Sequence, residues 1–455
     1  MVVVAPGTVV VVVVVVTVTV VEGVGRVDVV VATGGRTALA EDPQPAARPV
    51  ATIPTAPSLT FDSLRNAATP QRYSPALQLA MARRETSLTY SRVGRAEGRD
   101  VGMRALRLLD WKSDPVIVEV DEPTPGPGEV VVRVGAAGAC HSDLHLMHDF
   151  EPGMAPWAPP FTLGHENAGW VHAVGEGVEA FDIGQPVAVH GGWGCGGCDP
   201  CRSGNEPYCE NPTATQAPGG GAGLGLGLDG GMAELMLVPS DRHLVALPDG
   251  LDPVAAAPLT DAGLTPYHAI RRSRHKLTEG STAVLIGVGG LGHLGVQILK
   301  ATTPAKIVAV DSRPEALALA VAGGADLALA PSVELASEIR TFTGGRGADV
   351  VVDFVGSDAT LALGIAVARM RGDVTVVGIA GASFNWTFFS VPYEVSLQTT
   401  FWGSLPELKE VLDLGARGII KATTTTFSLA DAPIAYQRLA AGEIEGRAVI
   451  VPNAQ

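Results

Sequence analysis

A glycine-rich turn between a buried-strand pattern and a helical pattern constrains the fold of this chain more than any other stretch. Residues 282–286, Thr-Ala-Val-Leu-Ile, form a nearly continuous apolar run, which is typical of a parallel strand buried on both faces. The run leads into Gly287-Val288-Gly289-Gly290-Leu291-Gly292, and a helical pattern continues through Lys300. Glycines at these spacings permit a tight turn, close approach of the backbone to a pyrophosphate and close packing of the helix. The stretch therefore predicts a dinucleotide-binding βαβ unit.

A second strand pattern supports this prediction and indicates which dinucleotide binds. The strand pattern at residues 306–310 is followed by Asp311, about 20 residues after the last glycine. In dinucleotide-binding folds a carboxylate at this spacing binds the ribose diol of NAD. The same carboxylate would repel the 2′-phosphate of NADP, and Arg313 weakens this preference without reversing it. Further alternation predicts an α/β fold with a doubly wound parallel sheet. Its strand patterns lie at residues 349–354 and 373–378, with a helical pattern at residues 359–370 between them.

Four of the five cysteines lie close together on a glycine-rich stretch. Their spacing is Cys195-x2-Cys198-x2-Cys201-x7-Cys209. Four thiolates on one short loop can close a tetrahedron around a zinc ion and leave no coordination position open, which is typical of a structural site. An iron–sulfur cluster is the alternative, because three cysteines at x2 spacing also suit one. The x7 gap favours zinc, and the odd, clustered cysteines argue against disulfides and for a reducing cytoplasm. The glycine-rich run at residues 218–231 predicts a mobile surface loop.

The fifth cysteine belongs to a second group of possible metal ligands. Cys140-His141-Ser142-Asp143-Leu144-His145 is followed some 25 residues later by Gly164-His165-Glu166. A thiol and an imidazole are ligands that zinc prefers, and the nearby acid, hydroxyl and histidines are typical of a catalytic site. A lone Cys and a lone His are more often core residues, but the rest of the chain favours the metal site. Around them, β-rich runs with Gly and Pro turns predict a small barrel, with strands at residues 116–120, 130–134, 169–175 and 186–190.

The first hundred residues differ in composition from the rest. Residues 1–31 contain nineteen valines, and residues 1–21 carry no charge, so a membrane anchor is one interpretation. Pro6 and Gly7 interrupt this run, and valine is a poor helix former. Residues 1–102 hold ten Arg, no Lys and eight acidic residues, whereas the whole chain has a net charge of −15. We therefore expect residues 1–102 to be a disordered extension outside the fold, with Met103 as the natural start. The acidic charge argues against nucleic acid as a partner.

In chain order, the motifs are the Cys-His-Ser-Asp stretch, Gly-His-Glu, the four-cysteine loop and a late glycine-rich turn. Motifs in this order resemble those of the zinc-dependent medium-chain alcohol dehydrogenases. The resemblance covers the chain from Met103 to about Pro452. It implies a mainly β, barrel-like (GroES-like) catalytic domain and a Rossmann domain that binds NAD. The implied division is residues 103–257 for the first part of the catalytic domain, residues 258–402 for the Rossmann domain, and residues 403–455 for a return to the catalytic domain.

The resemblance also implies a departure in the catalytic zinc site. Alcohol dehydrogenase binds this zinc through two Cys and one His, but no sixth cysteine is present here. Where the family places the third ligand, the sequence reads Leu259-Thr260-Asp261-Ala262-Gly263-Leu264-Thr265. Asp261 is therefore the expected third ligand with Cys140 and His165, as in bacterial members active on secondary alcohols. The alternative is that Asp261 caps a helix that begins near Ala262.

By the same resemblance, residues near these ligands have expected roles in proton transfer. Ser142 would take the alcohol proton, and Asp143 would hold the histidine ligand from behind. Either His141 or His145 would pass the proton out through the cofactor ribose, and the family uses both positions. Glu166 would sit behind the metal as an exchangeable ligand.

Other positions correspond to cofactor and substrate contacts. Thr265 and Arg447 match positions that contact nicotinamide-side groups and pyrophosphate. Trp402, Trp157 and Phe150 are candidates for lining the substrate pocket, with core packing as the alternative interpretation.

The resemblance implies reversible NAD-linked oxidation of secondary and some primary alcohols to ketones or aldehydes. It further implies two Zn²⁺ per chain, a small-molecule alcohol or ketone substrate, a homodimer or homotetramer, a cytoplasmic location and no membrane partner. A polyol or threonine-type dehydrogenase of the same fold is one alternative. A non-catalytic sensor of zinc and nucleotide is another, against which the apparent proton relay argues.

Overall fold

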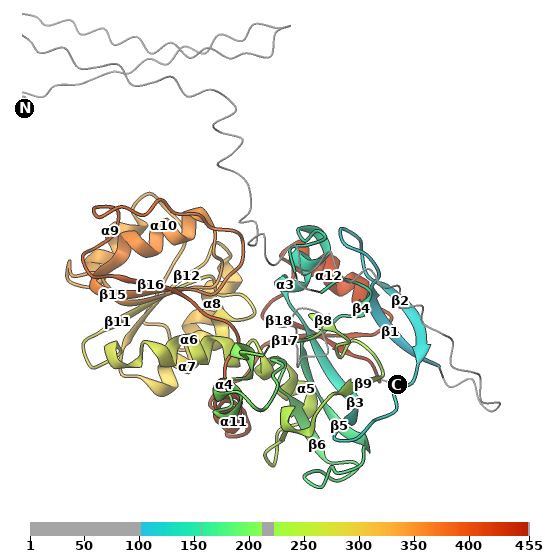
Figure 1. Cartoon of the computed structure of the whole chain (residues 1–455). Helices are drawn as coiled ribbons and strands as arrows, with labels where there is room; N and C mark the ends of the chain where they lie inside the picture. Colours follow the sequence, from blue (N-terminus) through green and yellow to red (C-terminus); the bar gives the residue numbers. More distant parts are fainter. Residues whose placement is uncertain (1–101, 156, 212–222, 454–455) are drawn as a thin grey trace, which may run out of the picture. The chain divides into compact units, whose positions relative to one another are not determined.

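The computed structural model describes residues 102–155, 157–211 and 223–453 (Figure 1). The predicted extension at residues 1–102 lies outside these residues, except for Gly102, the first residue of β1. The possible membrane anchor at residues 1–31 also lies outside them. Within the described part of the chain, no helix is long and apolar enough to cross a membrane.

Two sheets contain the strands next to Cys140 and His165, two of the predicted metal ligands. The larger has the strand order β10-β6-β5-β3-β18-β17, and β9 also pairs with β3. Its pairs are antiparallel apart from the parallel pair β17–β18. The strands are β3 (Val130–Ala139), β5 (Glu166–Val174), β6 (Pro186–Val189), β9 (Leu235–Val238), β10 (Leu244–Ala246), β17 (Thr424–Ser428) and β18 (Arg447–Val451). A smaller sheet of order β2-β1-β4 contains β1 (Gly102–Leu108), β2 (Val116–Asp121) and β4 (Phe161–Thr162).

The predicted doubly wound sheet is confirmed. Six strands are all parallel in the order β13-β12-β11-β14-β15-β16. They are β11 (Thr282–Ile286), β12 (Lys306–Val310), β13 (Leu327–Leu329), β14 (Ala348–Asp353), β15 (Ala368–Val376) and β16 (Ser396–Thr399). Every residue of β11 is buried, as expected for a strand covered on both faces.

Helices cover both faces of this sheet. Leu285 belongs to one core cluster with apolar residues of α7 and α8, whereas Val284 and Ile286 belong to another with residues of α9 and α10. This is the alternation of side chains along a strand. The helices are α7 (Gly292–Thr302), α8 (Pro314–Ala322), α9 (Leu335–Phe342) and α10 (Asp358–Val367). The helix predicted to reach residue 370 ends at Val367, and Ala368 already pairs with Ala348. Apolar runs of this kind suit a helix end and a strand start equally.

The last part of the chain returns from the parallel sheet to the antiparallel one. After β16, α11 (Leu405–Ala416) contacts α6 (Leu264–Arg272). The chain then forms β17 and β18, with β18 antiparallel to β3. Between these strands, α12 (Ala432–Ala440) contacts α3 (His141–His148). The C-terminal segment is therefore part of the structure around the metal ligands.

The mobile loop predicted at residues 218–231 is wrong for its described part, residues 223–231. Here β7 (Gly223–Leu224) and β8 (Gly227–Leu228) pair, and Leu224 is 1% exposed. A Cβ on Gly225 would lie 2.5 Å from the main chain of Gly164, and one on Gly230 would lie 2.2 Å from the Gly164 oxygen. These glycines allow the segment to pack closely against the residue before His165.

Candidate metal centre and cofactor site

Segments far apart in the sequence bring the first set of predicted metal ligands together. Cys140 precedes α3 as its N-cap, His165 lies between β4 and β5, and Asp261 follows the short helix η3 (Ala257–Thr260). One ligand atom from each residue lies within 4.8 Å of the other two. The three residues are only 7%, 2% and 9% exposed, respectively. A thiolate, an imidazole and a carboxylate suit Zn²⁺, and three protein ligands leave its fourth position open.

The charges around His165 favour a cation at this centre. Burial alone lowers the pKa of His165, but the carboxylates of Asp143 and Asp261 and the Cys140 thiol outweigh it and raise the pKa well above its usual value. Burial opposes ionisation of Asp261 too, yet His165, Arg447 and Thr265 lower the pKa of this carboxyl. A divalent cation would satisfy the same acids and would displace the proton from His165.

Asp261 does not cap the helix that follows it. The N-cap of α6 is Gly263, which makes no side-chain capping bond. The Asp261 carboxylate instead accepts a hydrogen bond of 2.5 Å from Thr265 Oγ1, and its Oδ2 lies 3.6 Å from His165 Nε2. The capping alternative is therefore wrong, and the side chain is directed at the other candidate ligands.

Asp143 lies behind His165, as the resemblance implies. Its Oδ1 is 3.1 Å from His165 Nδ1. Its Oδ2 accepts hydrogen bonds from the Cys140 amide (2.9 Å) and the Tyr436 hydroxyl (2.8 Å). Burial and the Asp143 charge raise the pKa of Tyr436 well above its usual value, so the hydroxyl remains a donor. Sequence reasoning missed Tyr436, which stands on α12 in an unremarkable helical pattern.

Glu166 and Arg447 form a buried ion pair next to the same centre. Arg447 Nε donates to Glu166 Oε2 at 2.9 Å, and Arg447 Nη2 contacts Glu166 Oε1. Glu166 Oε1 also accepts the Ala262 amide at 3.1 Å. Burial raises the pKa of Glu166 to about 7 against the opposing effect of Arg447. Arg447 Nη2 lies 4.0 Å from Asp261 Oδ2, and a Cβ on Gly290 would lie 2.5 Å from Arg447 Nη1. Arg447 therefore stands between the metal ligands and the glycine-rich turn.

The residues expected to move the proton lie on α3. Ser142 Oγ is 3.4 Å from His165 Nε2, beside the candidate ligands. His145 Nδ1 is 2.5 Å from Asp149 Oδ2. His141 is more exposed, and partial burial together with Arg447 and His145 lowers its pKa.

The three aromatic candidates for the substrate pocket separate into two groups. Phe150 and Trp157 stack in a cluster with Trp111 and Phe161, with ring centroids 5.5–6.4 Å apart. Trp402 is the one whose ring meets His165 edge-on, with centroids 6.1 Å apart and planes at 81°. The structure thus brings Trp402, from the segment after β16, next to a candidate metal ligand.

The glycine-rich turn has the geometry that a dinucleotide motif requires. Gly287 has φ 88°, and a Cβ on Gly292 would lie 1.9 Å from the Gly287 oxygen. Asp311, after the last residue of β12, accepts the Val288 amide at 2.7 Å and the Arg313 amide at 2.9 Å. Arg313 Nε is 3.3 Å from Asp311 Oδ1. The turn and the acid therefore lie together at the carboxyl edge of the sheet, where such folds bind ligands.

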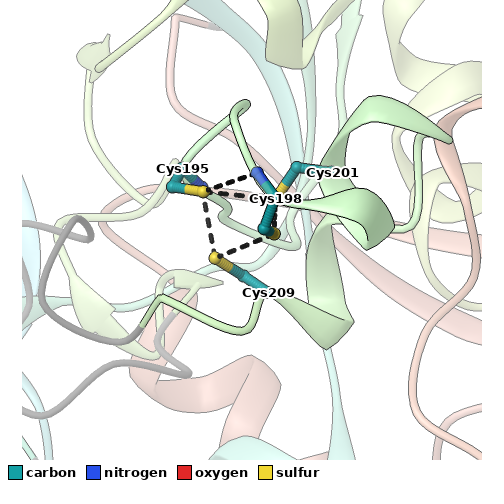
Figure 2. A group of neighbouring side chains, drawn as sticks. All are labelled: Cys195, Cys198, Cys201 and Cys209. Atoms are coloured by element: carbon teal, nitrogen blue, oxygen red, sulfur yellow. Dashed lines mark hydrogen bonds between the residues drawn. The ribbon is translucent and has the colours of Figure 1, made fainter.

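The four clustered cysteines also meet (Figure 2). Their Sγ atoms are 3.3 Å apart for Cys198–Cys201 and 3.9 Å apart for Cys195–Cys201 and Cys198–Cys209. A tetrahedron with Zn–S distances of about 2.3 Å has edges of about 3.8 Å, so the set fits one zinc ion. All four thiols are free.

The main chain favours the thiolate of Cys195, whereas burial raises the pKa of Cys201 and Cys209. The amides of Gly197 and Cys198 donate to Cys195 Sγ at 3.3 and 3.4 Å, and these bonds lower the pKa of Cys195 to about 6. Buried Glu206 is held by Arg242 Nη1 at 2.7 Å, while Arg242 Nη2 donates to the Gly194 oxygen at 3.0 Å. Neither Glu206 nor Arg242 was identified from the sequence, because no local pattern links them.

A hollow of about 550 Å³ lies elsewhere, among residues of α6, α7 and α11 that include Tyr267, Lys409 and Glu410. None of its lining residues is a candidate ligand or belongs to the glycine-rich turn. Its lining charges are of both signs.

Fold and site together define a protein of the zinc-binding dehydrogenase class. A family model described as the alcohol dehydrogenase GroES-like domain matches residues 126–249, and one described as zinc-binding dehydrogenase matches residues 290–417. An NAD-dependent alcohol dehydrogenase of Sulfurisphaera tokodaii is 36% identical over 362 residues, which cover 77% of this chain and 100% of that protein. A D-arabinose 1-dehydrogenase (NADP(+)) of Saccharolobus solfataricus is 34% identical over 351 residues, covering 76% of this chain and 97% of that protein.

A solved structure agrees with these relatives. The alcohol dehydrogenase of Aeropyrum pernix matches with a TM-score of 0.70 and 36% identity, over 77% of this chain and 100% of that chain. The chain therefore belongs to the zinc-dependent medium-chain alcohol dehydrogenase family, and it is an oxidoreductase.

Proposed function

We propose that this chain catalyses the reversible NAD-linked oxidation of secondary, and some primary, alcohols to ketones or aldehydes. The observation that carries the proposal is the convergence of Cys140, His165 and Asp261, with the Ser142 hydroxyl beside them. Relatives named NAD-dependent alcohol dehydrogenase support the same reaction.

In this proposal each residue near the first ligand set has one task. Zinc held by Cys140, His165 and Asp261 would supply Lewis acidity that lowers the pKa of an alcohol. Ser142 accepts the alcohol proton. Asp143, held by Tyr436, orients His165 through its Nδ1, so that Nε2 would bind the zinc.

We propose that either His141 or His145 passes the proton outward. The lowered pKa of His141 keeps its imidazole neutral. Asp149 lies at Nδ1 of His145, which leaves Nε2 of that ring available for the relay. Glu166 is paired with Arg447 and would serve as an exchangeable ligand of the zinc.

We further propose two zinc ions per chain, one in each ligand set. Cys195, Cys198, Cys201 and Cys209 would bind the second ion, with a structural role because four thiolates leave no open position. The sulfur spacing supports this ligand set over an isolated group of thiols.

The cofactor proposal is NAD rather than NADP. The turn Gly287-Val288-Gly289-Gly290-Leu291-Gly292 would bind the pyrophosphate, with Thr265 and Arg447 on the nicotinamide and pyrophosphate sides. The Asp311 carboxylate would accept the ribose hydroxyls and repel a 2′-phosphate. Its contact with Arg313 reduces this repulsion without removing the charge.

We propose the domain division at residues 103–257, 258–402 and 403–455, supported by the sheet membership of β17 and β18 and by the two matched family regions. A homodimer or homotetramer is supported by exposed aromatic residues between β15 and β16, including Trp386, Phe388 and Phe389. A cytoplasmic location is supported by five free cysteines.

The direct test is NADH formation by the purified, zinc-loaded protein with 2-propanol, with Ser142→Ala as the inactive comparison. No turnover with 2-propanol or with a panel of primary and secondary alcohols would contradict the proposal. A sugar or polyol dehydrogenase is the second candidate, favoured by the D-arabinose 1-dehydrogenase relative. It requires a higher kcat/KM for D-arabinose than for simple alcohols.

A further inference from the structure

The segment after β16 carries an aromatic side chain to the metal ligands in an unusual backbone conformation. Trp402 is 4% exposed, has φ 50°, and meets His165 edge-on at a centroid distance of 6.1 Å. A positive φ at a bulky residue other than glycine is unfavourable and persists only when surrounding contacts enforce it. The contacts on both sides of Trp402 therefore determine where its ring lies.

Several contacts of this segment come from the four-cysteine loop and the residues just before it. A Cβ on Gly191 would lie 2.2 Å from the Trp402 ring, so the ring packs directly on this main chain. His190 Nε2 is 2.8 Å from the Gly403 oxygen. The Leu405 amide donates to the Gly204 oxygen at 2.8 Å.

Tyr208 adds a contact with the residue that precedes Trp402 in the sequence. It ends the short helix η1 (Glu206–Tyr208), directly before Cys209. Its hydroxyl donates to the Phe401 oxygen at 3.0 Å and lies 3.1 Å from His268 Nε2. His268 Nδ1 is in turn 2.8 Å from Glu407 Oε2.

The Glu407 carboxylate connects His268 to the segment that contains Trp402. Glu407 Oε2 accepts the Ser404 amide at 2.8 Å. The hydroxyl of Tyr208 is therefore bonded directly to the residue before Trp402 and, through His268 and Glu407, to a residue after it.

We propose that Tyr208 is a positioning residue for alcohol oxidation, holding Trp402 beside His165 so that the four-cysteine loop sets the shape of the alcohol pocket. This inference rests on the proposed function. In this proposal the four-cysteine loop contributes to catalysis as well as to stability, because its Tyr208 side chain positions Trp402 next to the reacting centre.

The test is Tyr208→Phe, which keeps the ring and removes the hydroxyl. One hydrogen bond is worth a factor of roughly two to ten in an equilibrium. We expect the ratio of kcat/KM for 2-propanol to that for 1-phenylethanol to change by about this factor. The KM for NAD and a zinc content of two per chain should stay the same. Tyr393→Phe, at a tyrosine that is 51% exposed compared with 41% for Tyr208, is the matched control.

A double-mutant cycle with Trp402→Phe tests whether Tyr208 acts on substrate preference through Trp402. If Tyr208 acts through Trp402, Tyr208→Phe has no further effect on the ratio in the Trp402→Phe background. An unchanged ratio in Tyr208→Phe, or equal effects in both backgrounds, would overturn the proposal. Loss of zinc in Tyr208→Phe would also overturn it, by assigning the residue to loop stability.

Amide hydrogen exchange separates this proposal from the proposed function. Tyr208→Phe should speed exchange in a peptide that covers residues 401–405, and Tyr393→Phe should not. Wild-type protein that oxidises no alcohol would contradict the proposed function, whereas unchanged exchange in Tyr208→Phe would contradict the positioning role.

Discussion

Replacing Asp261 by Asn tests the departure of this chain from the two-cysteine ligand set of its family. The change keeps the size of the side chain and one oxygen but removes a negative charge. One thiolate and one carboxylate balance Zn²⁺, so the variant site would carry a net charge of +1. We expect zinc to fall from two per chain toward one and kcat/KM to fall by orders of magnitude.

The structure allows the effect of Asp261→Asn on stability to be separated from its effect on metal binding and turnover. Asp261 Oδ1 accepts a hydrogen bond from Thr265 Oγ1 at 2.5 Å, and replacing this charged acceptor by a neutral amide oxygen costs about 1 kcal/mol of stability. Removing a partner that only orients a ligand costs about 10–100-fold in metal affinity or activity. Loss of a direct ligand should exceed that range, so the metal and rate effects should far outweigh the stability effect.

Metal analysis and steady-state kinetics provide the assay, and Asp252→Ala is the control. Asp252 is a true helix cap, because its Oδ1 accepts the amides of Val254 at 2.8 Å and Ala255 at 3.1 Å. Its loss should cost about 1 kcal/mol and leave zinc and turnover unchanged. Asp261→Cys should retain more zinc than Asp261→Asn because a thiolate restores the charge. Two zinc ions and near-normal kcat in Asp261→Asn would refute the assignment.

Four further outcomes are expected. Cys198→Ser should lower zinc from two to one per chain and lower the Tm more than it changes the substrate profile; bound iron in the wild type would contradict the zinc assignment. Asp311→Asn should reduce the NAD:NADP ratio of kcat/KM by about tenfold or more through loss of the charge, and a wild type that prefers NADP would show that a cation governs the site. His293 donates to the Gly289 oxygen, accepts the Thr423 amide and has a pKa lowered by burial to about 4. The unfolded chain therefore binds this proton first, so the unfolding free energy falls by about 3 kcal/mol as pH drops from 6.5 to 4, and His293→Gln should flatten the fall measured in urea titrations. Deletion of residues 1–102 should leave a folded, active enzyme, and loss of folding or membrane recruitment of the full chain would contradict this.

Local patterns were sufficient to predict the parallel sheet, the four-cysteine set, and Cys140 and His165 of the other candidate set. Residues 282–286 and 306–310 coincide with β11 and β12, because a strand buried on both faces needs an unbroken apolar run. The four-cysteine loop could be recognised for a similar reason, since all its ligands lie within one short stretch. Asp261 needed the resemblance to the family, as an isolated acid before a helix has no distinctive local pattern.

The partners of the buried polar groups could not be predicted in this way. Buried polar groups need hydrogen-bond partners, but the sequence does not say which distant residue supplies each one. Tyr436 meets Asp143 across 293 positions, and Arg447 meets Glu166 across 281. The glycine-rich run failed for a related reason, because glycine serves close packing and loop mobility equally well.

These long-range partners explain why the C-terminal return matters to the metal site. Tyr436 on α12 fixes Asp143, which faces His165, while Arg447 at the start of β18 fixes Glu166, which accepts the amide next to Asp261. Two of the three candidate ligands are thus oriented from one segment that supplies no ligand itself. Because Arg447 also lies against Gly290, the same segment connects these ligands to the dinucleotide turn. A displacement of β18 would therefore disturb metal and cofactor binding together, even with every ligand and every glycine intact.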